Sequence, residues 1–133
     1  MFKKIKYEFL DFIKKEMNLA PFFEHQIVCK MFHFQTKSGF RHTKIDSYST
    51  KFAANFDQFM EVLQGIGGTV DNTSIEVKAR MRSDENIASH LEAMIKFLDG
   101  LTWNGKDLPR ELAQIVDLMI ADIRQTLYLF QFQ

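Results

Sequence analysis

The chain has 133 residues, and its 17 Lys and Arg balance 17 Asp and Glu, so no overall charge attracts nucleic acid or an anionic membrane. Its single cysteine, Cys29, cannot pair within the chain, which favours a reducing, intracellular setting. No apolar run approaches the roughly 18 residues of a membrane span, and the N-terminus lacks a signal-peptide core. We therefore expect one soluble domain over residues 1–133, without a membrane span.

Fourteen Phe and seven Met stand against two Pro and six Gly. Because glycine and proline, which commonly mark turns and the ends of strands, are few, this composition favours long helices and an all-α fold.

The first expected element is an amphipathic helix over residues 1–17. Its apolar face comprises Phe2, Ile5, Phe9, Phe12 or Ile13, and Met17. A basic amphipathic helix can lie on a membrane or touch nucleic acid, but Glu8, Asp11 and Glu16 dilute the positive face. We expect it to pack on the bundle and to show no strong nucleic-acid binding.

Two helices follow, over residues 21–35 and from about Phe40 to Gln64. Pro21 suits a first turn, where its missing N–H would be unpaired anyway. A turn is expected near Gly39, and the glycines after Gln64 end the second helix. The second helix carries one apolar stripe at helical spacing: Ile45, Tyr48, Phe52, Phe56, Phe59, Leu63 and Ile66.

Residues 69–82 have a different period. Ile75, Val77, Ala79 and Met81 alternate with Glu76, Lys78, Arg80 and Arg82. A period of two predicts an extended crossover with a buried apolar face, and a short strand is one form it can take. A connection of this length allows the helices before and after it to run parallel.

A third core helix is expected to start near Ser83, a residue suited to an N-cap, with Asp84 and Glu85 in its first turn and Gly100 at its end. Its core positions are Ile87, Leu91, Met94, Ile95 and Leu98.

After an Asn104-Gly105 turn, we expect a fourth helix capped by Asp107 with Pro109 in its first turn. Its stripe is Leu112, Ile115, Met119, Ile123, Leu127 and Phe130. The predicted fold is therefore an all-α four-helix bundle with a short extra N-terminal helix and a long extended crossover between the second and third core helices.

Four side chains of metal-binding type, His33, His42, Asp57 and Glu61, lie 9, 15 and 4 residues apart in sequence. Imidazole and carboxylate together suit iron or zinc, and Asp46 is a further candidate. Asp57 and Glu61 are one helical turn apart and roughly opposite the apolar stripe, so they cannot reach the core of their own chain. This geometry fits either a metal site at a subunit interface or a solvated acidic face.

The pattern His33-Phe34, His42, Asp57 with Glu61, and Gly67-Gly68 resembles the Dps-type mini-ferritins of the ferritin-like superfamily. The chain is also similar to small uncharacterised ferritin-like proteins of phages and large DNA viruses. The segments that carry this second likeness are His33 to Thr36, Arg41-His42, Asp57 with Glu61, and Thr126 to Phe130. The resemblance covers residues of about 20 to 130.

The resemblance implies a homo-oligomer that binds iron or another divalent metal and oxidises Fe(II), at a site made by histidines of one subunit and carboxylates of its two-fold mate. It leaves a second possibility, a structural protein such as a minor component of a virus particle, in which the ligands are vestigial. The segment between the two histidines is about three residues shorter than in mini-ferritins, and the crossover lacks their short helix. The chain contains no Glu-x-x-His motif, so a buried di-iron site of the large ferritins is not supported.

The other reactive residues give weaker signals. His25 and His90 lack carboxylates at metal spacing and are expected at the surface or at its boundary. Cys29 is expected as a small buried hydrophobe, and Trp103 as a loop residue that covers the end of the bundle.

Overall fold

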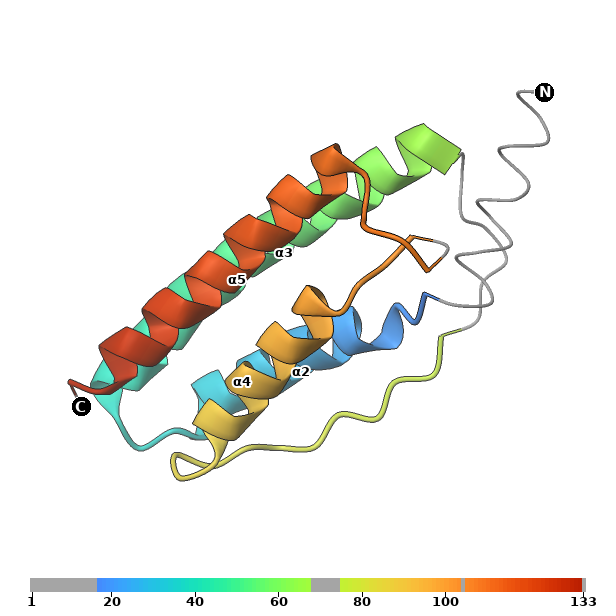
Figure 1. The fold of residues 1–133 in the computed structure, drawn as a ribbon. Helices are drawn as coiled ribbons and strands as arrows, with labels where there is room; N and C mark the ends of the chain where they lie inside the picture. Colours follow the sequence, from blue (N-terminus) through green and yellow to red (C-terminus); the bar gives the residue numbers. More distant parts are fainter. Residues whose placement is uncertain (1–16, 68–74, 104, 133) are drawn as a thin grey trace, which may run out of the picture.

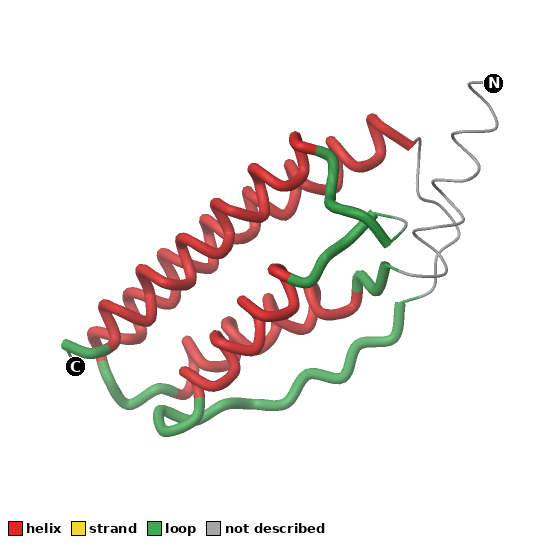
Figure 2. The backbone as a smooth tube through the Cα atoms, in the orientation of Figure 1, coloured by secondary structure: helices red, strands yellow, loops and turns green. Residues whose placement is uncertain are grey.

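The structure is a computed structural model that describes residues 17–67, 75–103 and 105–132 (Figure 1). In this part of the chain there are four helices and no β-strand: α2 (Ala20–Gln35), α3 (Gly39–Gly67), α4 (Ile87–Asp99) and α5 (Arg110–Phe130) (Figure 2). The predicted all-α bundle is confirmed. The expected N-terminal helix over residues 1–17 lies outside the described residues, except for its last position.

The four helices form a bundle in which every neighbour is antiparallel. α2 packs on α3 and α4, and α5 packs on the same two helices from the other side. In Figure 1, α3 and α4 run in one direction while α2 and α5 run in the opposite one. The two parallel helices therefore lie on a diagonal of the bundle, with an antiparallel helix on either side of each.

A three-residue corner joins α2 to α3. Pro21 occupies the first turn of α2, where the missing N–H removes no helical hydrogen bond. Ser38 caps α3, because its Oγ accepts a hydrogen bond from the backbone N–H of Arg41 at 3.1 Å. α3 continues to Gly67, three residues beyond the expected end at Gln64.

The core is built on phenylalanine rings from α2 and α3. Phe22 stacks on Phe56 with ring centroids 4.8 Å apart and lies 5.3 Å from Phe59. Six of the seven stripe residues expected on α3 are buried, and Ile66 is exposed. Each large apolar side chain removed from water stabilises the fold by about 1.5 to 3 kcal/mol.

The described part of the crossover, from residue 75 onward, is extended and lies along α2. The Lys78 N–H donates to the Glu24 carboxylate early in α2, and Gln35 at the end of α2 donates from Nε2 to the Arg82 carbonyl. The segment therefore follows α2 in the same direction and returns the chain to the end of the bundle where α4 begins (Figure 1).

The prediction that the apolar face of the crossover would be buried is wrong for three of its four residues, since Ile75, Ala79 and Met81 are exposed and Val77 is half-buried. Met81 is 52% exposed and Ile75 is 37% exposed. Instead Lys78, Arg80 and Arg82 border a groove against α2 and α4. A period of two defines two faces of an extended segment, but it does not determine which face lies against the helices.

α4 starts later than expected, at Ile87 instead of near Ser83. Ser83 donates from both its N–H and its hydroxyl to the Asn86 Oδ1, so its hydroxyl does not act as an N-cap acceptor. The Asp84 carboxylate is also occupied elsewhere, by hydrogen bonds from Thr36 Oγ1 and the Lys37 N–H. Residues 83–86 therefore form a turn that leads into the helix.

The expected Asp107 cap of α5 is also corrected. Pro109 precedes the first helical residue, its carbonyl accepts from the Ala113 N–H at 2.9 Å, and no side chain caps the helix. Before it, Trp103 and Lys106 exchange two backbone hydrogen bonds across a tight turn, with Gly105 at φ 73°. That positive φ favours glycine. Trp103 packs against the core, as expected for a residue covering the end of the bundle.

None of the four helices in the described part of the chain has both the length and the apolar character needed to cross a membrane.

Candidate functional site

His33 and His42 meet at the corner between α2 and α3. Their rings stack with centroids 3.9 Å apart and planes inclined by 19°. The His33 Nδ1 lies 3.0 Å from the His42 carbonyl oxygen, and the His42 Nδ1 lies 2.7 Å from the His33 carbonyl oxygen. Each imidazole is thus held by the backbone of the other histidine.

These two hydrogen bonds determine the tautomer of both rings. A carbonyl oxygen only accepts, so each Nδ1 carries the proton and donates it. In the neutral form the remaining lone pair of each ring is on Nε2, the nitrogen available to a metal ion. The corner therefore presents two imidazoles in a metal-binding tautomer, at a partly exposed place.

Asp57 and Glu61 lie far from this pair within one chain. Both are exposed on α3, in agreement with their helical phase. Asp57 is about 22 Å along the helix axis from His42, at 1.5 Å for each of 15 residues. Asp46 is also exposed and follows His42 by one turn. Among the described residues, no group of three or more His, Cys, Asp or Glu side chains is arranged to hold a metal ion. One chain brings the histidines together but not the carboxylates.

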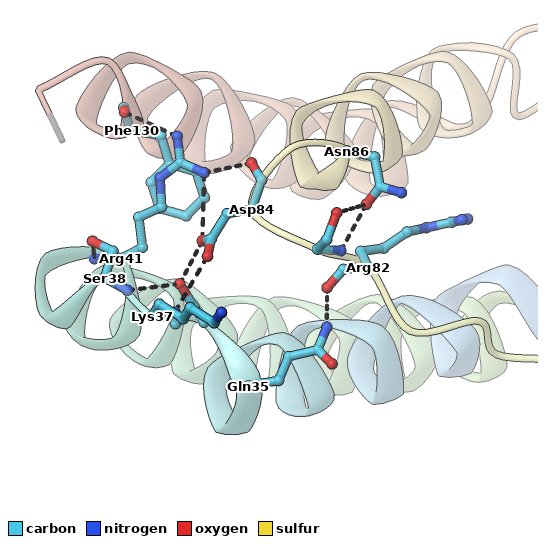
Figure 3. A network of polar contacts seen from close by, with 10 residues as sticks. Gln35, Lys37, Ser38, Arg41, Arg82, Asp84, Asn86 and Phe130 are labelled. Atoms are coloured by element: carbon cyan, nitrogen blue, oxygen red, sulfur yellow. Dashed lines mark hydrogen bonds and ion pairs between the residues drawn. The ribbon is translucent and has the colours of Figure 1, made fainter.

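A network of polar contacts fixes the corner from the other side (Figure 3). The Arg41 guanidinium donates to the Asp84 carbonyl at 2.8 Å and to the Phe130 carbonyl at 3.4 Å, and it lies over the Phe130 ring. It also forms an ion pair with the Asp84 carboxylate at 3.7 Å. The hydrogen bond from the Thr36 hydroxyl, above all, lowers the pKa of the Asp84 carboxyl. Arg41 and Asp84 therefore tie the α2–α3 corner to the start of α4 and the end of α5.

The expectation that His25 lies at the surface or at its boundary is wrong, because its side chain is completely buried. Its Nε2 lies 2.6 Å from the Tyr48 hydroxyl of α3, and its Nδ1 lies 2.8 Å from Nε2 of His90 on α4. The helical spacing of Phe22, His25, Cys29 and Phe32 contains the signal for this position, since the other three residues lie on the buried face of α2.

Burial keeps both members of this histidine pair neutral. Desolvation, with the neighbouring His90 as a second cause, lowers the pKa of His25 to about 3. Desolvation and the charge of Arg82 lower the pKa of His90 to about 4. A neutral imidazole has one donor and one acceptor. The hydrogen bonds therefore run in one direction, either from Tyr48 through His25 to His90 or in reverse.

The Tyr48–His25–His90 chain crosses the bundle between two hollows. At the Tyr48 end is a cavity of about 250 Å³ with Cys29, Tyr48 and Phe52 in its lining. His90 lies in the groove beneath the crossover. Cys29 is free and buried, as expected, and desolvation raises its pKa to about 12, so it is a thiol and a poor nucleophile at neutral pH.

Comparison of the chain with profiles of known protein families, with curated proteins and with solved structures finds no match.

Proposed function

We propose that this chain is a ferritin-like protein that binds a divalent transition metal, iron foremost, at a site shared between two subunits. His33 and His42 of one subunit supply imidazole nitrogens, and Asp57 and Glu61 of a second subunit supply carboxylate oxygens. Asp46, one turn from His42, is an additional ligand candidate.

The observation that carries the proposal is the reciprocal hydrogen bonding of His33 and His42. A hydrogen bond donated by Nδ1–H to a carbonyl oxygen orients an imidazole and makes its Nε2 a better metal ligand. Among the described residues of the same chain, no group of three or more ligands forms around these two rings, so they make an incomplete site. Exposed Asp57 and Glu61, one turn apart on the outer face of α3, are the complementary half.

The bundle topology supports the same assignment. Two antiparallel helix pairs, with α3 and α4 parallel and an extended segment between them, form the arrangement expected of a ferritin-like fold. The proposal includes residues 1–17 as an additional docked helix and residues 69–82 as the complete crossover. It also includes an intracellular homo-oligomer, because a shared site requires at least a dimer.

Oxidation of bound Fe(II) to Fe(III), with dioxygen or peroxide as the electron acceptor, is the reaction that follows from the resemblance to mini-ferritins. A buried di-iron centre is not part of the proposal, because the chain has no Glu-x-x-His motif.

A test starts from protein purified without chelator, with metal measured by elemental analysis and Co(II) titration. We expect wild type to bind metal stoichiometrically, and the double variant Asp57→Ala plus Glu61→Ala to bind at least tenfold more weakly. The matched control is Glu92→Ala plus Asp117→Ala, which removes two exposed carboxylates from other helices and should bind like wild type.

Subunit mixing tests whether the site is shared. In a dimer of either double variant alone, His33→Ala plus His42→Ala or Asp57→Ala plus Glu61→Ala, every site lacks its histidines or its carboxylates. Mixed dimers of the two variants contain one intact site, so equal mixing should restore about one quarter of wild-type binding, since half of the dimers are mixed. Failure to restore binding in dimers shown to be mixed would contradict a shared site.

A second candidate function is structural, such as a minor component of a virus particle. The observation that favours it is the number of large apolar side chains left exposed, including Phe34, Leu118, Tyr128 and Phe132. Absence of metal from the purified protein, together with unchanged thermal stability in Asp57→Ala plus Glu61→Ala, would favour this function over metal binding.

A further inference from the structure

A groove of about 230 Å³ runs between the crossover, α2 and α4. Lys78, Arg80 and Arg82 border it on the crossover side, while Glu24 of α2 and His90 of α4 lie on the helical side. This groove is at the opposite end of the Tyr48–His25–His90 chain from Cys29, and it contains none of the proposed metal ligands.

The three cationic residues occupy alternate positions of an extended segment, so they lie on one side of it. At about 3.3 Å per residue, successive members are about 7 Å apart. In the described part of the chain, none of their side chains makes a hydrogen bond or an ion pair with protein. Figure 3 shows the Arg82 side chain directed away from the Arg41 and Asp84 network, without a dashed contact. The Glu24 carboxylate accepts instead from the Lys78 backbone N–H at 3.1 Å.

Arg82, which borders this groove, has an unsatisfied donor. Its Nε is shielded from solvent and has no hydrogen-bond partner among the described residues. A buried donor without a partner is unfavourable, and buried donors in folded proteins generally have an acceptor. The charge of Arg82 also acts on the groove, since it is the second cause, after burial, of the lowered pKa of His90. The unsatisfied donor and the three unpaired cations at the groove point to a missing anionic acceptor.

We propose that this groove binds the phosphate group of a small molecule, held by Arg80 and Arg82 with His90 at the floor. A guanidinium presents several N–H donors in a plane that matches two oxygens of a phosphate. The bound oxygens accept hydrogen bonds from the two guanidinium groups and neutralise the unpaired cations. A nucleic-acid strand is a poorer occupant, because three cations beside Glu24, on a chain of zero net charge, neutralise few of its phosphates.

The groove is separate from the proposed metal corner, so the two proposals can fail independently. Backbone hydrogen bonds of the crossover with Glu24 and Gln35 hold it beside α2, and they do not involve the Arg80 or Arg82 side chains.

The test is a titration of the full chain with inorganic phosphate at pH 7 and constant ionic strength, with chloride as the reference anion. NMR of the histidine rings follows binding, and a His90→Gln spectrum assigns the His90 signal. We expect saturable binding with a dissociation constant on the order of 1 mM. Because a bound anion favours the protonated ring, we also expect phosphate to raise the pKa of His90 from its value of about 4.

The double variant Arg80→Gln plus Arg82→Gln should weaken phosphate binding at least tenfold. Arg80→Gln alone changes an exposed side chain and keeps the test valid if the double variant folds poorly. The matched control, Lys51→Gln plus Arg124→Gln, removes two exposed cations on other helices and should bind like wild type. Adenosine triphosphate and a single-stranded oligonucleotide are titrated in parallel to distinguish the source of the phosphate.

The proposal would be overturned by equal responses to phosphate and chloride, by unchanged binding in the Arg80 variants, or by tighter binding of the oligonucleotide than of either small phosphate compound. Loss of binding in the control double variant equal to that in Arg80→Gln plus Arg82→Gln would also overturn it, since the effect would then come from overall charge.

Discussion

His25 is a titratable residue placed where an apolar side chain would normally lie. Its two hydrogen bonds, to Tyr48 and His90, compensate for burial only while both imidazoles are neutral. The other groups that face it are Cys29 of α2, whose thiol is raised in pKa, and Arg82 of the crossover beyond His90. Among the described residues, no carboxylate is hydrogen-bonded to either ring, so nothing there offsets a proton.

This burial predicts a loss of stability in mild acid. The unfolded chain takes up protons on these histidines as the pH falls through 6.5, whereas the folded chain does not until about pH 4 for His90 and about pH 3 for His25. Stability is therefore fully present above pH 6.5 and decreases below it. The contribution of His25 should fall by about 2 kcal/mol between pH 7 and pH 5.

Denaturant unfolding at pH 7 and pH 5 measures this loss. The double variant His25→Phe plus Tyr48→Phe removes the buried ring and its hydroxyl partner together, so it leaves neither polar group alone in the core. The variant should lose less stability on acidification than wild type. Equal losses in the two proteins would show that His25 is not the group responsible.

At the scale of elements, Arg41 joins three of them. It contacts the Asp84 carbonyl before α4 and the Phe130 carbonyl and ring at the end of α5. Arg41→Ala removes these hydrogen bonds, an ion pair and a cation–π contact at once. We expect it to lower the free energy of unfolding by about 2 to 3 kcal/mol.

Urea denaturation measures this change, and hydrogen exchange locates it. Protection should fall most at the first turn of α4 and the last turn of α5. Arg124→Ala is the control, because Arg124 is exposed on α5 and should change stability by less than about 0.5 kcal/mol. If the two variants are equally stable, the network in Figure 3 is a surface contact without a structural role.

The helices α2 and α3 could be predicted well from the sequence because their apolar periodicity extends over many residues. The starts of α4 and α5 could not. Ser83 and Asp84 have the composition of a helix start, but their hydrogen bonds are made with Asn86 and with the distant residues Thr36 and Lys37. Such a side chain can cap a nearby helix or bond to a residue that is remote in sequence. Which of the two it does depends on the tertiary fold.

The crossover illustrates the same limit. Its period of two was readable, yet its cations and not its apolar residues border the groove against α2 and α4. The sequence of the segment does not indicate that Glu24 and His90 are its neighbours in the fold. The candidate site could be predicted only in part. The contact between His33 and His42 follows from the short corner between their helices, whereas the sequence of one chain does not show where a second subunit would lie.

At the scale of the whole molecule, the outer face of α3 is the surface on which the proposed function depends. We expect the protein to be a dimer or larger at about 50 μM, because Asp57 and Glu61 complete a site only when another subunit supplies His33 and His42. Asp57→Lys plus Glu61→Lys should shift the protein toward monomer, since it places positive charge opposite the proposed metal-binding corner.

Light scattering and sedimentation measure this shift. Glu92→Lys plus Asp117→Lys makes the same change of charge on exposed positions of α4 and α5, and it should leave the mass unchanged. A monomer at this concentration, with and without added metal, would remove the physical basis for a shared site.

The reciprocal bonding of His33 and His42 also has a consequence for how this surface can change in evolution. Each ring is oriented by the backbone of the other residue and is stacked on the other ring at 3.9 Å. Replacing one histidine therefore removes the stacking partner of the second and frees it to turn away. The two histidines should therefore be retained or lost together in evolution, and we expect related sequences to have both or neither.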